Sequence, residues 1–174
     1  MAKPSRNSDP GNVLSPARTF FVTTKTSMGR NLLQSERNAM LIVDVLRSYQ
    51  ADGKFEVHDF VVMPNHVHLL ISVPGDSTIE RVMQLIKGGF SYRLRHEFAY
   101  TGEVWQRGFS ETRVVDQKSY RQYKKYIAEN PVKAGLAKSG EEFAFCFARL
   151  AAAKAQRLKP VQQQAPVGTA EAVP

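Results

Sequence analysis

Two histidines, His66 and His68, stand two residues apart in a run of apolar and β-branched residues. Successive side chains of a β-strand point to opposite faces of the sheet, so both imidazoles should emerge on one face. Val67, Leu69 and Ile71 would then enter a core on the other face. Because imidazole is a common ligand of divalent metal ions, the pair predicts half of a metal site whose third ligand lies elsewhere in the chain.

A run of tyrosines that ends in an amide supplies a second set of chemical groups. Tyr120, Tyr123 and Tyr126 precede Asn130 in a segment that Asp116 can cap as a helix. Only Tyr126 has Asn130 four residues further on, a spacing that places the two side chains on one helix face. A phenol is a poor nucleophile near neutral pH, but it can attack a phosphate that a metal ion polarises. The spacing selects Tyr126 as the tyrosine beside the ion, and the other two are expected to pack.

Turn and cap signals predict the elements that must position these groups. Strands are expected over 19–24, 55–63, 66–73 and within 102–115, and helices after Ser35, Ser77 and Asp116. The last helix should end near Asn130, because Pro131 restricts the residue before it. The order β-α-β-β-α-β-α predicts an α+β fold, namely a ferredoxin-like (RRM-like) antiparallel sheet with helices on one face plus an extra C-terminal helix bearing the tyrosine. The other face would be free for a ligand.

Length and composition indicate one basic domain. We expect this domain over residues 17–150, between a flexible N-terminal arm over 1–16 and a disordered, basic, Ala- and Gln-rich tail over 151–174. The 24 Lys and Arg residues against 16 Asp and Glu give a net charge of +8. This excess favours a polyanionic partner, most simply nucleic acid.

Cysteine usage and hydropathy indicate a cytoplasmic protein without a membrane partner. Cys146 is the only cysteine, which excludes an internal disulfide framework and fits a reducing cytosol. The N-terminus lacks the apolar core of a signal peptide, and no apolar run is long enough to cross a bilayer.

Several segments together resemble one known family. His66-Val67-His68 resembles the histidine-hydrophobic-histidine motif of the HUH endonuclease superfamily, and the segment 126–136 is similar to the signature of its single-tyrosine transposases. The REP-associated tyrosine transposases and their insertion-sequence relatives are the nearest match. The likeness extends from about Arg18 to Leu136, and it includes the segments 63–65, 84–88 and 104–109.

The resemblance implies a mechanism and a substrate. Tyr126 would attack a phosphate of single-stranded or hairpin DNA, giving a 5′-phosphotyrosine link and a free 3′-hydroxyl, and rejoining would reverse the step. His66, His68 and Asn130 would hold Mg2+ or Mn2+. One departure is Thr112, near which relatives often carry a histidine. Related insertion-sequence enzymes work as dimers and the REP-associated branch can act alone, so both a homodimer and a monomer stay open.

Basic and aromatic residues outside this centre are expected to contact DNA. They are Lys87, Gly88, Arg95, Trp105, Arg107, Lys124, Lys125 and Lys133. Trp105 is the better candidate for stacking on unpaired bases, whereas core packing competes for Phe109. Alternatively, Lys87, Ser91 and Arg95 form only a solvated stripe at helical spacing.

Other interpretations fit parts of the same pattern. An isolated pair of histidines is more often an ordinary polar feature of a solvated strand. A catalytically silent, domesticated transposase would only bind structured DNA or RNA, as other ferredoxin-like sheets do. A metal-dependent phosphodiesterase would use activated water, and Tyr126 would merely pack.

Overall fold

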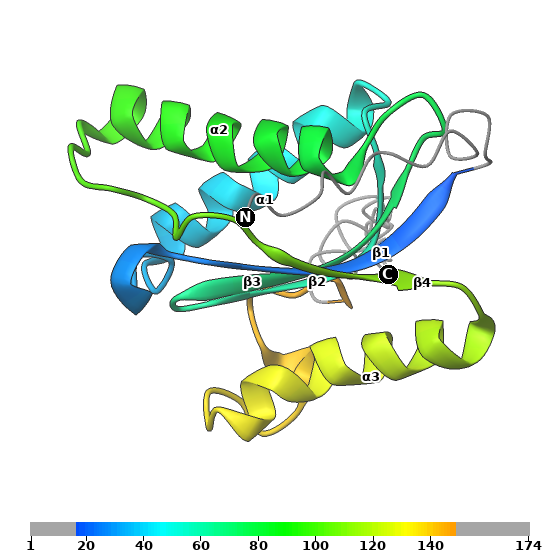
Figure 1. Cartoon of the computed structure of the whole chain (residues 1–174). Coiled ribbons are helices and arrows are strands. Elements are labelled where there is room, and N and C mark those ends of the chain that lie inside the picture. The colour runs from blue at the N-terminus through cyan, green and yellow to red at the C-terminus, as the bar shows by residue number, and fades with distance from the viewer. Residues whose placement is uncertain (1–16, 149–174) are drawn as a thin grey trace, which may run out of the picture.

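Four antiparallel strands form one sheet in the order β2-β3-β1-β4 (Figure 1). The computed structural model describes residues 17–148. The strands are β1 (Arg18–Lys25), β2 (Glu56–Met63), β3 (His66–Val73) and β4 (Ser110–Val114). This order and the alternation of strands and helices confirm the predicted α+β, ferredoxin-like fold.

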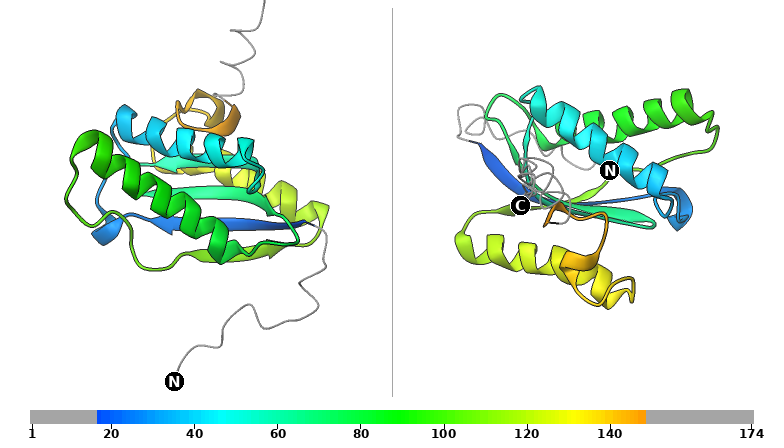
Figure 2. Two further views of the ribbon diagram at one scale, coloured as in Figure 1. Left: turned by 90° about the horizontal axis from the view of Figure 1, so that it is seen from above. Right: turned by 180° about the vertical axis from the view of Figure 1, so that it is seen from behind.

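Three long helices cover the sheet, and they divide between its two faces (Figures 1 and 2). They are α1 (Glu36–Ala51), α2 (Ile79–Phe98) and α3 (Gln117–Lys133), with short 3-10 turns at Ser27–Gly29 and Gly140–Glu142. α1 and α2 pack together on one face, and α3 lies across the opposite face. The expectation that this opposite face is free is therefore wrong, because α3 covers part of it.

The alternation of β3 divides the apolar residues into two cores. Val67, Leu69 and Ile71 are at most 1% exposed and belong to the large core beneath α1 and α2, as predicted. Leu70 points the other way, into a smaller cluster that also contains Ile127 of α3. The sheet thus separates one well-packed layer from one that is only partly covered.

Side chains cap all three helices, at two of the three predicted positions. The Ser35 hydroxyl accepts the N–H of Asn38, and the Asp116 carboxylate accepts that of Ser119. The cap of α2 is one residue later than predicted. Thr78, rather than Ser77, is the N-cap, because its hydroxyl accepts the N–H of Arg81.

The last helix is longer than predicted, whereas the last strand lies within the predicted range. α3 continues through Pro131 to Lys133, although the proline has no N–H for the preceding turn. The chain beyond the helix then closes the helix end, because the N–H of Leu136 donates to the carbonyl of Pro131 at 2.8 Å. β4 begins only at Ser110, since Gly108 has a φ of 74° that interrupts an extended strand.

Two predictions concern segments outside the described residues. These are the flexible arm over 1–16 and the tail over 151–174. Within residues 17–148, no helix is long and apolar enough to cross a membrane.

Candidate active site

His66 and His68 lie on the face of β3 that α3 covers, and their rings meet edge-on with centroids 4.7 Å apart. Each ring is held through its Nδ1 atom. Nδ1 of His66 donates to Asn65 Oδ1 at 2.7 Å, and Nδ1 of His68 lies 2.8 Å from Thr23 Oγ1. Because Nδ1 is engaged in both rings, Nε2 is the nitrogen that each ring can offer to a ligand.

Asn130 reaches this pair from α3. Its Nδ2 lies 3.1 Å from Nε2 of His68, which accepts this N–H and therefore carries its own proton on Nδ1, toward Thr23. The Asn130 side chain also forms a hydrogen bond with the His66 ring. A 180° rotation of the Asn130 side-chain amide would exchange Nδ2 for Oδ1. This oxygen is the atom that binds hard cations.

The protein keeps both imidazoles neutral at pH 7. The pKa of His68 is lowered to about 4, mainly by burial and also by the charges of His66 and Lys25. Burial also lowers the pKa of His66, Asn130 opposes this by hydrogen bonding, and Lys25 adds to it. A neutral imidazole is the form that binds a metal ion, so both rings are in their ligating state.

The donor atoms fit a divalent cation, and they admit several such ions. Two neutral ring nitrogens and one amide oxygen leave coordination positions open for substrate oxygens. Within residues 17–148, no group of three or more His, Cys, Asp or Glu side chains is suited to a metal ion. Asn130 is therefore the candidate third ligand beside His66 and His68.

Tyr126 is the tyrosine that α3 presents to this centre. Its ring lies 5.2 Å from that of His68 and 5.6 Å from that of Phe21, between centroids, and 41% of the residue is exposed. Tyr123 instead stacks on Phe21 at 4.3 Å, and Tyr120 packs against the same small core. The phenol of Tyr126 is thus both close to the imidazoles and open to a substrate.

A pocket of about 710 Å³ brings these groups together. Its walls come from β1, the turn before β3, β3 itself, the segment before β4, and α3. The lining residues are Thr23, Lys25, Gly29, Asn65, His66, His68, Gln106, Ser110, Tyr126 and Asn130. The nucleophile candidate and the three ligand candidates therefore share one cavity of the size that ligand sites have.

The predicted basic residues of α3 lie on the same helix as Tyr126. Lys124, Lys125 and Lys133 are exposed. Lys125 and Lys133 pair with Glu129 at 3.6 Å and 2.9 Å, and Nζ of Lys133 lies 5.8 Å from the centroid of the Tyr126 ring. These exposed pairs are weak, so a phosphate can compete for the ammonium groups.

The other predicted DNA contacts lie on α2 or in the segment before β4, and none of them lines this pocket. Arg95 and Arg107 are exposed. Trp105 is only 7% exposed, and its indole N–H donates to the carbonyl of Lys87, whereas Phe109 is partly exposed. Trp105 therefore belongs to the core, contrary to its expected accessibility, and Phe109 packs against this core as expected while part of it stays exposed.

Sequence reasoning missed the residues that orient the histidines and close the pocket. Thr23 faces His68 because β1 and β3 pair in that register, which no local pattern reveals. Asn65 had a signal, since it immediately precedes His66 in the turn. Ser110 lines the pocket, and Thr112, two residues further along β4, pairs with Phe21.

Comparison with known proteins identifies the family of this chain. Residues 21–130 match the model of the family described as "Transposase IS200 like". The chain belongs to this family. The four residues at the centre of the pocket lie within the matched span, and the family is one of DNA-processing enzymes.

This member of the family is similar to several named proteins. It is 29% identical over 128 residues to the REP-associated tyrosine transposase of Escherichia coli (strain K12), covering 73% of this chain and 74% of that one. It is 30% identical over 90 residues to the ISDra2 transposase TnpA of Deinococcus radiodurans, covering 48% and 64%. A solved structure of a REP-associated tyrosine transposase bound to a REP hairpin superposes with a TM-score of 0.64 at 28% identity, covering 97% of this chain and 94% of that one. The resemblance stated from the motifs is confirmed.

Proposed function

We propose that this transposase nicks and rejoins single-stranded DNA at hairpin or palindromic repeats, with Tyr126 as the nucleophile. The observation that carries the proposal is the single pocket that Tyr126 shares with His66, His68 and Asn130. A protein that only binds nucleic acid has no need to bring a phenol, two neutral imidazoles and an amide to one place.

In the proposed step, Oη of Tyr126 attacks the phosphorus of the scissile phosphate. The Oη–P bond forms as the P–O3′ bond breaks, which leaves a 5′-phosphotyrosine and a 3′-hydroxyl. The phenol loses one proton, and the leaving oxygen gains one. Since the phosphodiester is exchanged rather than hydrolysed, a 3′-hydroxyl can reverse the step without an external energy source.

The residues around the phenol prepare the site for a charged phosphate. A bound Mg2+ or Mn2+ would polarise this phosphate and stabilise the charge that it gains. His66, His68 and Asn130 are the residues that would hold the ion. Thr23 and Asn65 fix the two rings through Nδ1, so that both Nε2 atoms stay available.

Charge and a relative's substrate support hairpin DNA as the partner. The chain carries a net charge of +8, and exposed lysines lie on both sides of Tyr126 along α3. Cationic side chains of this kind position a nucleic-acid backbone. The similar REP-associated tyrosine transposase was solved bound to a REP hairpin, which makes a repeat hairpin the substrate to test first.

Trapping of a covalent adduct tests the proposal. The protein is incubated with labelled hairpin DNA that has single-stranded flanks, with Mg2+ or with a chelator, and is then denatured. We expect a denaturation-resistant complex with Mg2+ and none with the chelator. Tyr126→Phe should abolish the complex, whereas the matched variant Tyr123→Phe should retain it, because Tyr123 packs against Phe21.

Any other result of this experiment would indicate a different function or a different nucleophile. An adduct with Tyr126→Phe contradicts the assignment of the nucleophile. DNA binding without any adduct in the wild type indicates a catalytically silent binding protein. Metal-dependent cleavage that never traps DNA indicates a phosphodiesterase that uses activated water.

A further inference from the structure

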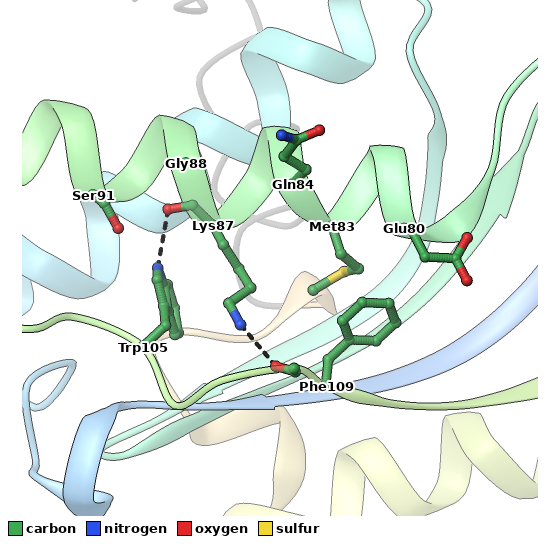
Figure 3. Close-up of a pocket in the computed structure, with 9 residues that line it drawn as sticks. Glu80, Met83, Gln84, Lys87, Gly88, Ser91, Trp105 and Phe109 are labelled. Carbon is green, nitrogen blue, oxygen red and sulfur yellow. Dashed lines mark hydrogen bonds between the residues drawn. The ribbon is translucent and has the colours of Figure 1, made fainter. Parts of the chain in front are cut away.

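A second pocket, of about 380 Å³, lies between α2 and the segment that leads into β4 (Figure 3). We propose that it holds one unpaired base of the DNA strand that the active site cleaves. This inference rests on the function proposed above, and it adds a site for base recognition. Chemistry at Tyr126 does not require such a site, so the two can be tested separately.

The walls of the second pocket suit the face of a base. Phe109 and Met83 lie against one another at one side, and Trp105 stands at the other, with the side chain of Lys87 between them (Figure 3). Trp105 is fixed by packing on Phe90, at 5.2 Å between ring centroids. The ring of Phe109 is only partly buried, so it offers the surface on which a base can stack.

Gly88 borders the open space of this pocket, and contacts within the protein do not explain why this position is a glycine. A Cβ placed on Gly88 would meet no atom within 4 Å. The next residue, Gly89, differs, since a Cβ there would lie 3.0 Å from the ring of Tyr49. Glycine weakens a helix relative to alanine. Gly89 is therefore explained by the helix packing, whereas Gly88 leaves space that a ligand can use.

The second pocket and the active-site pocket share one wall. Gln106 and Ser110 line the active site, while Gly108 and Phe109, between them in sequence, line the second pocket. Lys87 fastens this segment to α2, because its ammonium donates to the carbonyls of Gln106 at 2.9 Å and Gly108 at 2.7 Å. A DNA strand that crosses this wall can place its phosphate in one pocket and a neighbouring base in the other.

One end of the second pocket carries an unused hydrogen-bond acceptor. Oε2 of Glu80 is buried and has no hydrogen-bond donor within the described part of the chain. Every unpaired base exposes at least one donor, either an exocyclic amino group in adenine, cytosine and guanine or the ring N3–H in thymine. The pocket should therefore prefer a base that offers a donor over one whose donor has been blocked.

Single base removals in the DNA test the proposal. Binding is measured on the Tyr126→Phe background, so that cleavage does not contribute, with hairpin DNA whose flanks carry one abasic site at successive positions. We expect one position beside the cleavage point at which removal of the base weakens binding by about 5-fold to 100-fold, as the loss of one stacked base does. At that position, 3-methylthymine, which has no hydrogen-bond donor, should bind more weakly than thymine, and Glu80→Gln should reduce the difference.

Two protein variants test whether the base at that DNA position binds in the second pocket. One variant fills the pocket and the other removes its aromatic wall. Gly88→Leu and Phe109→Ala should each remove the penalty at that one position and leave the other positions unchanged. The matched control is Ser48→Leu, which adds a leucine to the exposed surface of α1. An unchanged penalty in both pocket variants, or a wild-type profile without any such position, overturns the proposal. Equal binding of thymine and 3-methylthymine overturns the part assigned to Glu80.

The outcomes for the two proposals are distinct. Failure to bind any hairpin or single-stranded DNA contradicts the proposed function and, with it, the base pocket. DNA binding and adduct formation without a position-dependent penalty contradict the base pocket alone.

Discussion

The two faces of the sheet differ in what the same strands contribute to them. Beneath α1 and α2, β3 presents Val67, Leu69 and Ile71 to a large apolar core. Toward α3, the alternate residues of the same strand include His66 and His68, which face a polar pocket. Stability and chemistry are therefore assigned to opposite faces, and a shift of β3 by one residue would exchange them.

The less densely packed face is the one that α3 covers, and α3 contributes Tyr126 and Asn130 to the site from far along the chain. α3 is anchored by a small cluster of Val61, Met63, Leu70, Ile127 and Cys146. Elements with few apolar contacts open at a lower free energy than the main core. We expect α3 to be the element whose position decides activity, and the large core to decide whether the protein folds.

The strongest test of this comparison removes the two imidazoles from the α3 face. His66→Ala combined with His68→Ala should abolish metal-dependent cleavage, because both ring ligands are lost, and should leave the thermal unfolding midpoint close to that of the wild type. Cleavage and melting curves measure the two effects. The control is His96→Ala, since His96 is exposed on α2. Full activity of the double variant, with metal still needed, contradicts the ligand assignment.

A pair of neighbouring leucines separates the two cores. Leu69 and Leu70 are both fully buried but point to opposite faces. Each change to alanine should lower the free energy of unfolding by about 2–5 kcal/mol, measured by urea denaturation. Per folded molecule, Leu69→Ala should keep its rate of adduct formation, whereas Leu70→Ala should lower it by loosening α3. Equal effects of both changes on this rate would remove the distinction between the faces.

A pair of neighbouring threonines gives a smaller and equally matched contrast. Thr23→Val removes the hydroxyl beside Nδ1 of His68 and should weaken metal affinity by about 10-fold to 100-fold, measured by titration with Mn2+. Thr24 points to the other face, and its buried hydroxyl has no partner within the described residues. Thr24→Val should leave metal affinity unchanged and raise the free energy of unfolding by about 1 kcal/mol. Equal metal affinity of the two variants would show that Thr23 does not orient the ring.

The smallest expected effect is confined to the end of α2. Ala99 has a φ of 51°, in the left-handed region that glycine adopts at the ends of helices. Ala99→Gly should raise the free energy of unfolding by about 0.5–1 kcal/mol. Adduct formation should stay unchanged, because this change is remote from α3. A lower unfolding midpoint would contradict the account of strain at this residue.

Local patterns were sufficient for much of the fold and for the residues proposed at the centre. Alternation along β3 predicted which face each residue takes, and spacing along α3 paired Tyr126 with Asn130. The cap signals were informative because a capping hydroxyl or carboxylate acts within one turn of its own helix. These features depend on residues that are close in sequence.

Features that depend on distant residues could not be predicted in this way. The register that places Thr23 beside His68 joins strands that are far apart in sequence. The end of α3 was also predicted too early, because the helix continues through Pro131 to Lys133. Trp105 was expected to be accessible to bases but is buried, and no periodic pattern reveals burial in a segment without regular structure.

The most direct measurement is to locate the tyrosine that becomes attached to DNA. After reaction with hairpin DNA and Mg2+, trypsin releases residues 126–133 as a peptide whose sole tyrosine is Tyr126, while Tyr120 and Tyr123 fall in other peptides. Mass spectrometry should find the nucleotide on the 126–133 peptide alone. A nucleotide on Tyr120 or Tyr123, or on no tyrosine although the DNA is cut, would contradict the account.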